Sequence, residues 1–215
     1  MVTVEKKCGG KTIEKGIIAL GLAASLALPL TAQAATTYTV QKGDTMWKIA
    51  SKYHVGTSEV IKSNPSVKNP NTIYPGQKLN IPTVDSATQS FEEQVVTLTN
   101  KERAKQGLKP LTMNWELQRV ARIKSEDMRD KNYFDHNSPT YGSPFDMMKN
   151  FGIKYTSAGE NIAAGQQTPE AVVKAWMESP GHRANILNSS YNQIGVGYAK
   201  GGSYGIYWTQ QFIKN

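Results

Sequence analysis

Four side chains in the second half of the chain have the chemistry of a metal site or of an acid/base pair. They are two imidazoles and two carboxylates, at His136, Glu160, Glu178 and His182. Both groups accept a proton or donate a lone pair near neutral pH, as a divalent metal such as Zn²⁺ or general acid/base catalysis requires. Each of the four is therefore a candidate catalytic residue, and His136 and His182 are candidate metal ligands.

Turn residues next to both histidines predict that each lies at the end of an element and faces a cleft. Asn137, Ser138 and Pro139 follow His136, and Pro180 and Gly181 precede His182. The alternative is that each histidine is a hydrogen-bonded packing residue. The chain has three histidines in all, and the grouping of two with two acids favours a shared site.

Residues 1–34 predict a secretory signal peptide. Four lysines precede an apolar run over residues 17–30, and Ala32-Gln33-Ala34 is a small-x-small cleavage site. The run is shorter than the roughly 20 apolar residues that span a bilayer, so we expect no stable membrane span after cleavage. The single cysteine, Cys8, would leave with this segment, so we expect neither a disulfide nor a catalytic thiol in the mature chain.

The net charge predicts attraction to anionic surfaces. The chain has 25 Lys and Arg against 17 Asp and Glu, and removing the four lysines and two acids of residues 1–34 leaves 21 against 15, or +6. A bacterial wall or a phospholipid headgroup would attract such a protein. The basic residues form no run, and no zinc-finger or RNA-binding pattern occurs, so we do not expect a nucleic-acid partner. The oligomeric state is not readable from the sequence.

Residues 37–83 predict a small module with the order strand, helix, helix, strand. Strand residues occupy 38–40 and 79–82, and short helices fit 46–53 and 58–63. Residues 84–90 are polar and small, which predicts a flexible linker.

The segments YTVQKGDTMWKIA and NTIYPGQKLNIP make this module resemble a LysM domain along its whole length. The resemblance implies binding of peptidoglycan and other polymers of N-acetylglucosamine in a shallow groove between the first strand-helix loop and the last helix-strand loop. The residues that match the groove are Gly43, Asp44, Thr45, Met46, Ile73, Tyr74, Pro75 and Gly76.

Residues 91–215 predict a second domain of the α+β class. Helical patterns run from Phe91 to near Gly107, from Asn114 to before Tyr133, and from the Thr168-Pro169 start signal. Residues 193–199 and 204–213 are rich in β-branched and aromatic residues and flank a Gly-Gly turn, which predicts a terminal hairpin.

Four motifs in this domain, FDHNSP, AGENIA, WMESPGHRANIL and IGVGY, resemble a bacterial CAP domain of the cysteine-rich secretory protein, antigen 5 and pathogenesis-related (SCP-like) superfamily. The resemblance implies an α-β-α sandwich with a central cleft lined by two histidines and up to two glutamates. His136, Glu160 and His182 match these cleft positions. Glu178 follows Trp176 by two residues where the family commonly has three, and one residue rotates a helical side chain by about 100°.

The expected protein is secreted and associated with the cell wall or a spore envelope, with the LysM module holding it on peptidoglycan. Three roles for the CAP domain stay open. The first is ligand binding without chemistry, because the sequence provides no set of nucleophile, base and oxyanion donors. The second is a wall-directed hydrolase or protease, with Glu160 as base and the histidines as ligands or proton carriers. The third is lipid binding.

Overall fold

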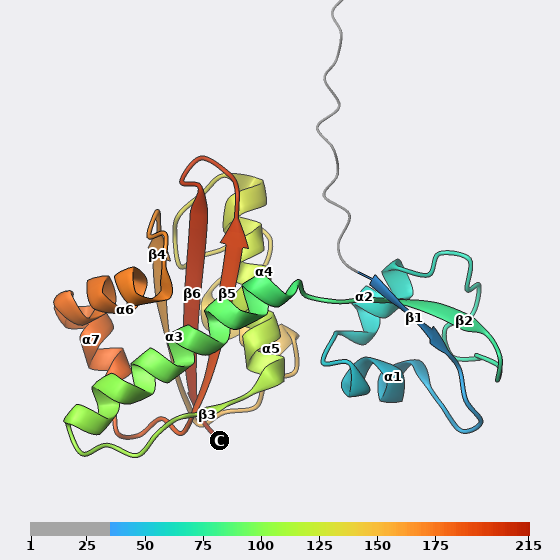
Figure 1. The fold of residues 1–215 in the computed structure, drawn as a ribbon, viewed down its shortest axis with the longest axis horizontal. Helices are drawn as coiled ribbons and strands as arrows, with labels where there is room; N and C mark the ends of the chain where they lie inside the picture. The colour runs from blue at the N-terminus through green and yellow to red at the C-terminus, as the bar shows by residue number, and fades with distance from the viewer. Residues whose placement is uncertain (1–34) are drawn as a thin grey trace, which may run out of the picture. The chain divides into compact units, whose positions relative to one another are not determined.

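Figure 1 shows a computed structural model that describes residues 35–215. The predicted signal peptide, residues 1–34, lies outside the described residues. Within the described part, none of the helices has the length and apolar character needed to cross a membrane.

The first module has the expected order of elements. Strand β1 (Ala35–Thr39) pairs antiparallel with β2 (Lys78–Pro82), and helices α1 (Met46–Lys52) and α2 (Thr57–Lys62) lie between them in sequence. Thr45 begins α1 as its N-cap, because its hydroxyl accepts a hydrogen bond from the Lys48 amide. The small core is apolar throughout and consists of Val40, Met46, Ile49, Ala50, Val55, Val60, Leu79 and Ile81.

The expected linker is largely helical. Helix α3 (Ser86–Lys105) includes residues 86–90, which we predicted to be flexible. The Asp85 carboxylate accepts a hydrogen bond of 2.9 Å from the Thr88 amide and so caps the helix five residues earlier than the apolar periodicity indicated. The polar residues of this first turn form the solvent-exposed start of a helix whose later turns are buried.

A four-stranded sheet forms the middle of the second domain, in the order β3-β5-β6-β4. Strands β5 (Gln193–Lys200) and β6 (Ile206–Lys214) are the predicted terminal hairpin, β4 (Ser157–Ala164) pairs antiparallel with β6, and the short β3 (Thr112–Met113) pairs parallel with β5. We predicted neither β3 nor β4. Strand β4 lies at one edge of the sheet.

Helices cover both faces of this sheet, which gives the α-β-α arrangement (Figure 1). Helix α4 (Trp115–Lys131) packs on one face, and α3, α6 (Pro169–Glu178) and α7 (Pro180–Ile186) form the other layer. Helix α5 (Pro144–Asn150) packs beside α4. The main core lies between the sheet and the α3–α6 layer and includes the fully buried Trp176, Trp208 and Phe212.

Two glycines allow α4 to lie directly against β5. A Cβ atom at Gly195 would be 2.4 Å from the Gln118 amide nitrogen, and one at Gly197 would be 2.2 Å from the Ala121 carbonyl carbon. The backbones are therefore in contact where side chains would normally separate a helix from a sheet. In the same layer, the buried Ser125 hydroxyl lies 2.8 Å from the Thr209 hydroxyl.

Substitution of Gly197 by alanine should destabilise the fold, because the added methyl group meets helix backbone that cannot move alone. We expect Gly197→Ala to reduce the free energy of unfolding by about 3 kcal/mol, measured by urea denaturation. Gly181→Ala is the matched control, since a Cβ atom there meets nothing within 4 Å. Equal stability of the two variants would show that α4 and β5 are not in backbone contact.

Candidate functional site

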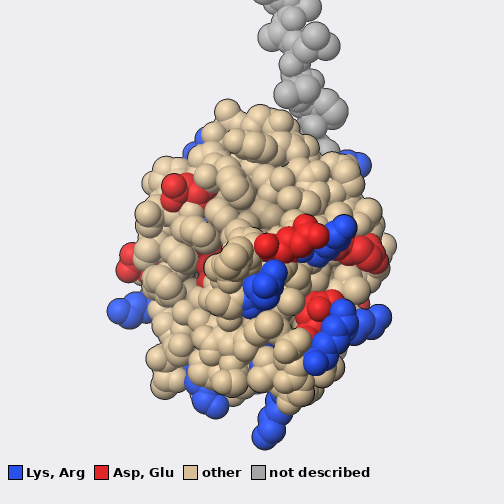
Figure 2. Space-filling view, turned by 90° about the vertical axis from the view of Figure 1, so that its left-hand side faces the viewer, with Lys and Arg blue, Asp and Glu red and all other residues tan. Residues whose placement is uncertain are grey.

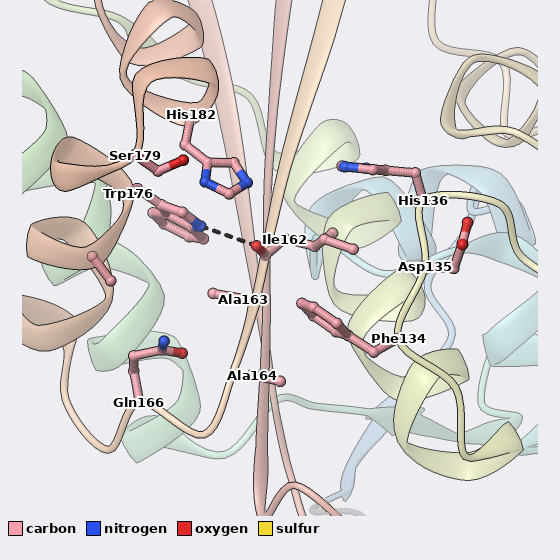
Figure 3. A pocket seen from close by; sticks show the side chains of 11 residues that line it. Phe134, Asp135, His136, Ile162, Ala163, Ala164, Gln166, Trp176, Ser179 and His182 are labelled. Carbon is pink, nitrogen blue, oxygen red and sulfur yellow. Dashed lines mark hydrogen bonds between the residues drawn. The ribbon is translucent and has the colours of Figure 1, made fainter.

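A cavity of about 480 Å³ opens beside the edge strand β4, and both candidate histidines line it (Figure 3). His136 comes from the loop after α4, and His182 comes from α7. The remaining lining residues are mostly small or apolar: Phe134, Asp135, Ile162, Ala163, Ala164, Gln166, Ala175, Trp176 and Ser179. The structure therefore brings together residues that are 46 positions apart in the sequence.

Glu160 lies on β4 behind His136, where it orients the imidazole. Its side chain is 1% exposed, and its Oε1 atom lies 2.9 Å from His136 Nδ1. The Oε2 atom accepts a hydrogen bond of 2.9 Å from Gln211 on β6. Both carboxylate oxygens are therefore engaged inside the protein.

The two imidazoles have opposite protonation tendencies. The hydrogen bond to Glu160 raises the pKa of His136 above its usual value, against the smaller opposing effect of burial. Burial, together with the proximity of His136, lowers the pKa of His182. The hydrogen bond to Glu160 thus favours the cationic form of His136, whereas burial favours the neutral form of His182.

Buried amide side chains hold α7 against β4 and so place His182. Asn161 on β4 donates from Nδ2 to the His182 carbonyl at 3.1 Å and to Gln210 Oε1 at 3.0 Å. Asn185 on α7 donates to the Glu160 carbonyl at 3.2 Å and to Asn161 Oδ1 at 2.9 Å. These contacts connect the backbones that carry Glu160 and His182.

Lys124 on α4 holds the loop that carries His136. Its side chain is fully buried, and its ammonium donates to the carbonyl oxygens of Asp135 at 2.7 Å and His136 at 2.8 Å. A third donation, at 3.1 Å, reaches the Tyr133 hydroxyl. All three donor positions of the ammonium are used, which offsets the cost of burying its charge.

Asp127, one turn further along α4, holds the rest of the same loop. Its carboxylate accepts hydrogen bonds of 2.6 Å from the hydroxyls of Tyr133, Ser138 and Thr140. Burial tends to raise the pKa of Asp127, but these three donors outweigh it and hold the pKa below the usual value. The Ser138 hydroxyl is thus a buried structural donor.

We did not predict a role for Lys124 or Asp127, although the sequence carries a signal for the first. Lys124 occupies the buried face of α4 at helical spacing between Ala121 and Met128, which are both fully buried. A charged residue on the buried face of a helix must find hydrogen-bond partners inside the protein. The partners themselves are backbone carbonyls of a loop, which sequence patterns do not identify.

Glu178, the candidate residue that departs from the family spacing, does not line the cavity. Its side chain is 67% exposed and lies 3.8 Å from Lys174 on the same helix. Two helical positions after the buried Trp176 correspond to a rotation of about 200°, which directs this side chain to solvent. Figure 2 views the molecule from the side on which α6 lies in Figure 1, and it shows acidic and basic side chains next to one another on this surface.

The described side chains do not fit a three-ligand zinc centre. Within residues 35–215, no three His, Cys, Asp or Glu side chains converge as metal ligands. His136 and His182 face the cavity, but Glu160 already contacts His136 and Gln211 with its two oxygens.

The first module has a groove of about 380 Å³ between the two predicted loops. Asp44, Thr45, Met46 and Ile73 line it as expected, together with Trp47, Thr57, Ile61, Pro70, Asn71 and Thr72. Gly43, Pro75 and Gly76 do not line it, and Tyr74 lines a neighbouring hollow with Val67, Lys68 and Gln77. We missed Trp47, whose 67% exposure is unusual for an indole; Met46 beside it is 4% exposed and belongs to the core.

Comparison with known proteins identifies both parts of the chain. The model of the cysteine-rich secretory protein family, CAP, matches residues 96–212, and the LysM domain model matches residues 38–82. The Bacillus subtilis protein "Uncharacterized protein YkwD" is 66% identical over 128 residues, which are 60% of this chain and 49% of that one. An endolysin of Bacillus phage B103 is 47% identical over 45 residues, 21% of this chain and 17% of that one.

A solved extracellular protein of Bacillus anthracis that contains an SCP domain has the same fold, with a TM-score of 0.55 and 33% identity. The match covers 66% of this chain and 47% of that one. The chain thus spans about half the length of the first relatives that it matches.

Replacement of Lys124 by methionine should release the His136 loop. The pKa of His136, measured by NMR titration, should then fall toward its usual value as the imidazole leaves Glu160. Stability should fall by about 3 kcal/mol, because buried carbonyls lose their donor. If Lys124 acted only through its positive charge, its removal would instead raise the pKa of His136, and that result would contradict the positioning role. Lys131→Met, at an exposed site on the same helix, is the control.

Proposed function

This chain belongs to the cysteine-rich secretory protein family and carries a LysM domain, and we propose that it is a secreted cell-wall protein that holds peptidoglycan in the LysM groove and a second wall ligand in the CAP cavity. The observation that carries the proposal is the groove between the two LysM loops, with Trp47 exposed in it. Export would follow from the signal peptide that residues 1–34 predict.

The LysM groove has the features that an N-acetylated sugar requires. The turn at Asp44 and Thr45 supplies hydroxyl, carboxylate and backbone polar groups, and Ile73 and Trp47 supply apolar surface. A sugar ring combines an apolar face with a polar rim, so such a groove binds both. Sequence likeness to phage endolysins and to a Staphylococcus aureus protein named probable autolysin SsaALP supports association with the wall.

Ligand binding without chemistry is the role that the CAP cavity supports best. Glu160, the expected base, is 1% exposed and uses both oxygens on His136 and Gln211. A carboxylate held in this way positions an imidazole but does not reach a substrate or an attacking water.

A wall-directed hydrolase is the second candidate, and the paired imidazoles favour it. The pKa of His136 is raised and that of His182 is lowered, which suits an acid and a base on opposite sides of a substrate. In this arrangement Glu160 acts through His136.

Trp47→Ala should weaken sedimentation of the full chain with purified peptidoglycan by about tenfold, because the exposed indole gives the groove a broad apolar surface. Tyr74→Ala is the matched control, since Tyr74 is similarly exposed, at 65%, but lies outside the groove. Loss of sedimentation in the Tyr74 variant alone would place the glycan in the neighbouring hollow.

Incubation of the full chain with peptidoglycan should release no soluble muropeptides or peptides, as measured by chromatography of the supernatant. Release that disappears in His182→Gln would establish the hydrolase instead. Release that persists in this variant would indicate a contaminating enzyme, and sedimentation of the variant confirms that its LysM domain still binds.

A further inference from the structure

The CAP cavity has a polar end and an apolar remainder. His136, His182 and Ser179 lie at one end in Figure 3, while Phe134, Ile162 and the small side chains of β4 lie below them. The Gln166 amide is at the edge opposite the imidazoles. A ligand must therefore match three zones along the cavity: the polar end, the apolar middle and the edge at Gln166.

The polar end favours a ligand group with negative charge. The Glu160 carboxylate is buried behind His136 and contacts His136 and Gln211 with its two oxygens, so it raises the pKa of His136 and favours the imidazolium without presenting an oxygen to the cavity. Asp135 is the only acid that lines the cavity within the described residues, and its Oδ1 accepts a hydrogen bond of 2.7 Å from the Asn137 amide. The ammonium of Lys124, bonded to the His136 carbonyl, adds positive potential.

The opposite edge favours a hydrogen-bonding group. Gln166 Oε1 is buried and has no hydrogen-bond partner among the described residues. An unpaired buried acceptor costs free energy that a ligand N–H would recover. Gln166 is held in place through its backbone, because its carbonyl accepts a 2.8 Å hydrogen bond from the Trp208 indole.

The zone between the two ends has room for small apolar groups. Ala163, Ala164 and Ala175 line it and fill little of it, and the ring of Phe134 is 42% exposed beside them. The volume of about 480 Å³ is in the lower half of the range for ligand sites. This zone therefore matches the small apolar groups of a ligand.

We propose that the cavity binds the carboxylate end of a short peptide whose last residues have small apolar side chains. The carboxylate lies beside His136, the side chains contact the alanines of β4 and α6, and a peptide N–H donates to Gln166. The proposal rests on the proposed function, since peptidoglycan consists of glycan strands that carry short peptides. The LysM domain would hold the glycan while the CAP domain binds the peptide.

The test is an NMR titration of the full chain with N-acetyl-alanyl-alanine, made from L- and from D-alanine, and with the C-terminal amides of both. At least one free acid should bind ten times more tightly than its amide, and this preference should shrink as the pH rises through the pKa of His136. His136→Gln should abolish the preference for the acid. Gln166→Leu should weaken binding about fivefold, and Gln167→Leu, at the exposed neighbouring position, should not.

Equal binding of acid and amide, or no effect of Gln166→Leu, would overturn the proposal. Binding of octanoate in the cavity without binding of any of the peptide acids would identify a lipid site instead. Sedimentation with peptidoglycan depends on the LysM groove and is measured on the same samples. A chain that sediments but binds no dipeptide would contradict this inference alone, and one that does not sediment would contradict the proposed function.

Discussion

The contact between α4 and β5 is the constraint on which the rest of the CAP domain depends. Gly195 and Gly197 leave no side chain between helix and sheet, so the α4 backbone lies against the strand. From the same helix, Lys124 and Asp127 hold the loop that carries His136. A helix one side-chain layer further out would leave both charges without these partners. The two glycines thus support the helix that holds the His136 loop.

The edge strand β4 divides the site into two chemical environments. Successive side chains of a strand point to opposite faces, so Glu160 faces the α4 side while Asn161 faces α7. The His136 ring therefore has a carboxylate partner. His182 is anchored through its backbone carbonyl, which accepts a hydrogen bond from Asn161, and among the described residues its ring has no acid partner. This difference accounts for the opposite pKa shifts of the two imidazoles. The exposed edge of β4 is itself capped, because Asn185 and the Trp176 indole donate to the carbonyls of Glu160 and Ile162.

Local signals predicted the elements that have their own caps and periodicity. Asn114 and Thr168 begin α4 and α6 as expected, and the C-terminal hairpin follows from its apolar strands and glycine turn. Strand β4 escaped prediction because its sequence, SAGENIAA, has no apolar alternation; its burial comes from β6 and from the amide network around Asn161. The linker prediction was wrong because a single cap at Asp85 outweighs a polar composition.

The sequence by itself determined the two families, the order of the elements in the LysM domain, the main helices and the terminal hairpin of the CAP domain, and three residues of the cavity region, His136, Glu160 and His182, because short motifs carry these features. Tertiary structure decided what the residues do. It placed Glu178 in solvent beside Lys174, made Glu160 a buried partner of His136, and exposed Trp47 in the LysM groove. These outcomes depend on burial and on hydrogen bonds between segments distant in sequence, such as Glu160 with Gln211, and no local pattern encodes which distant group will be the partner.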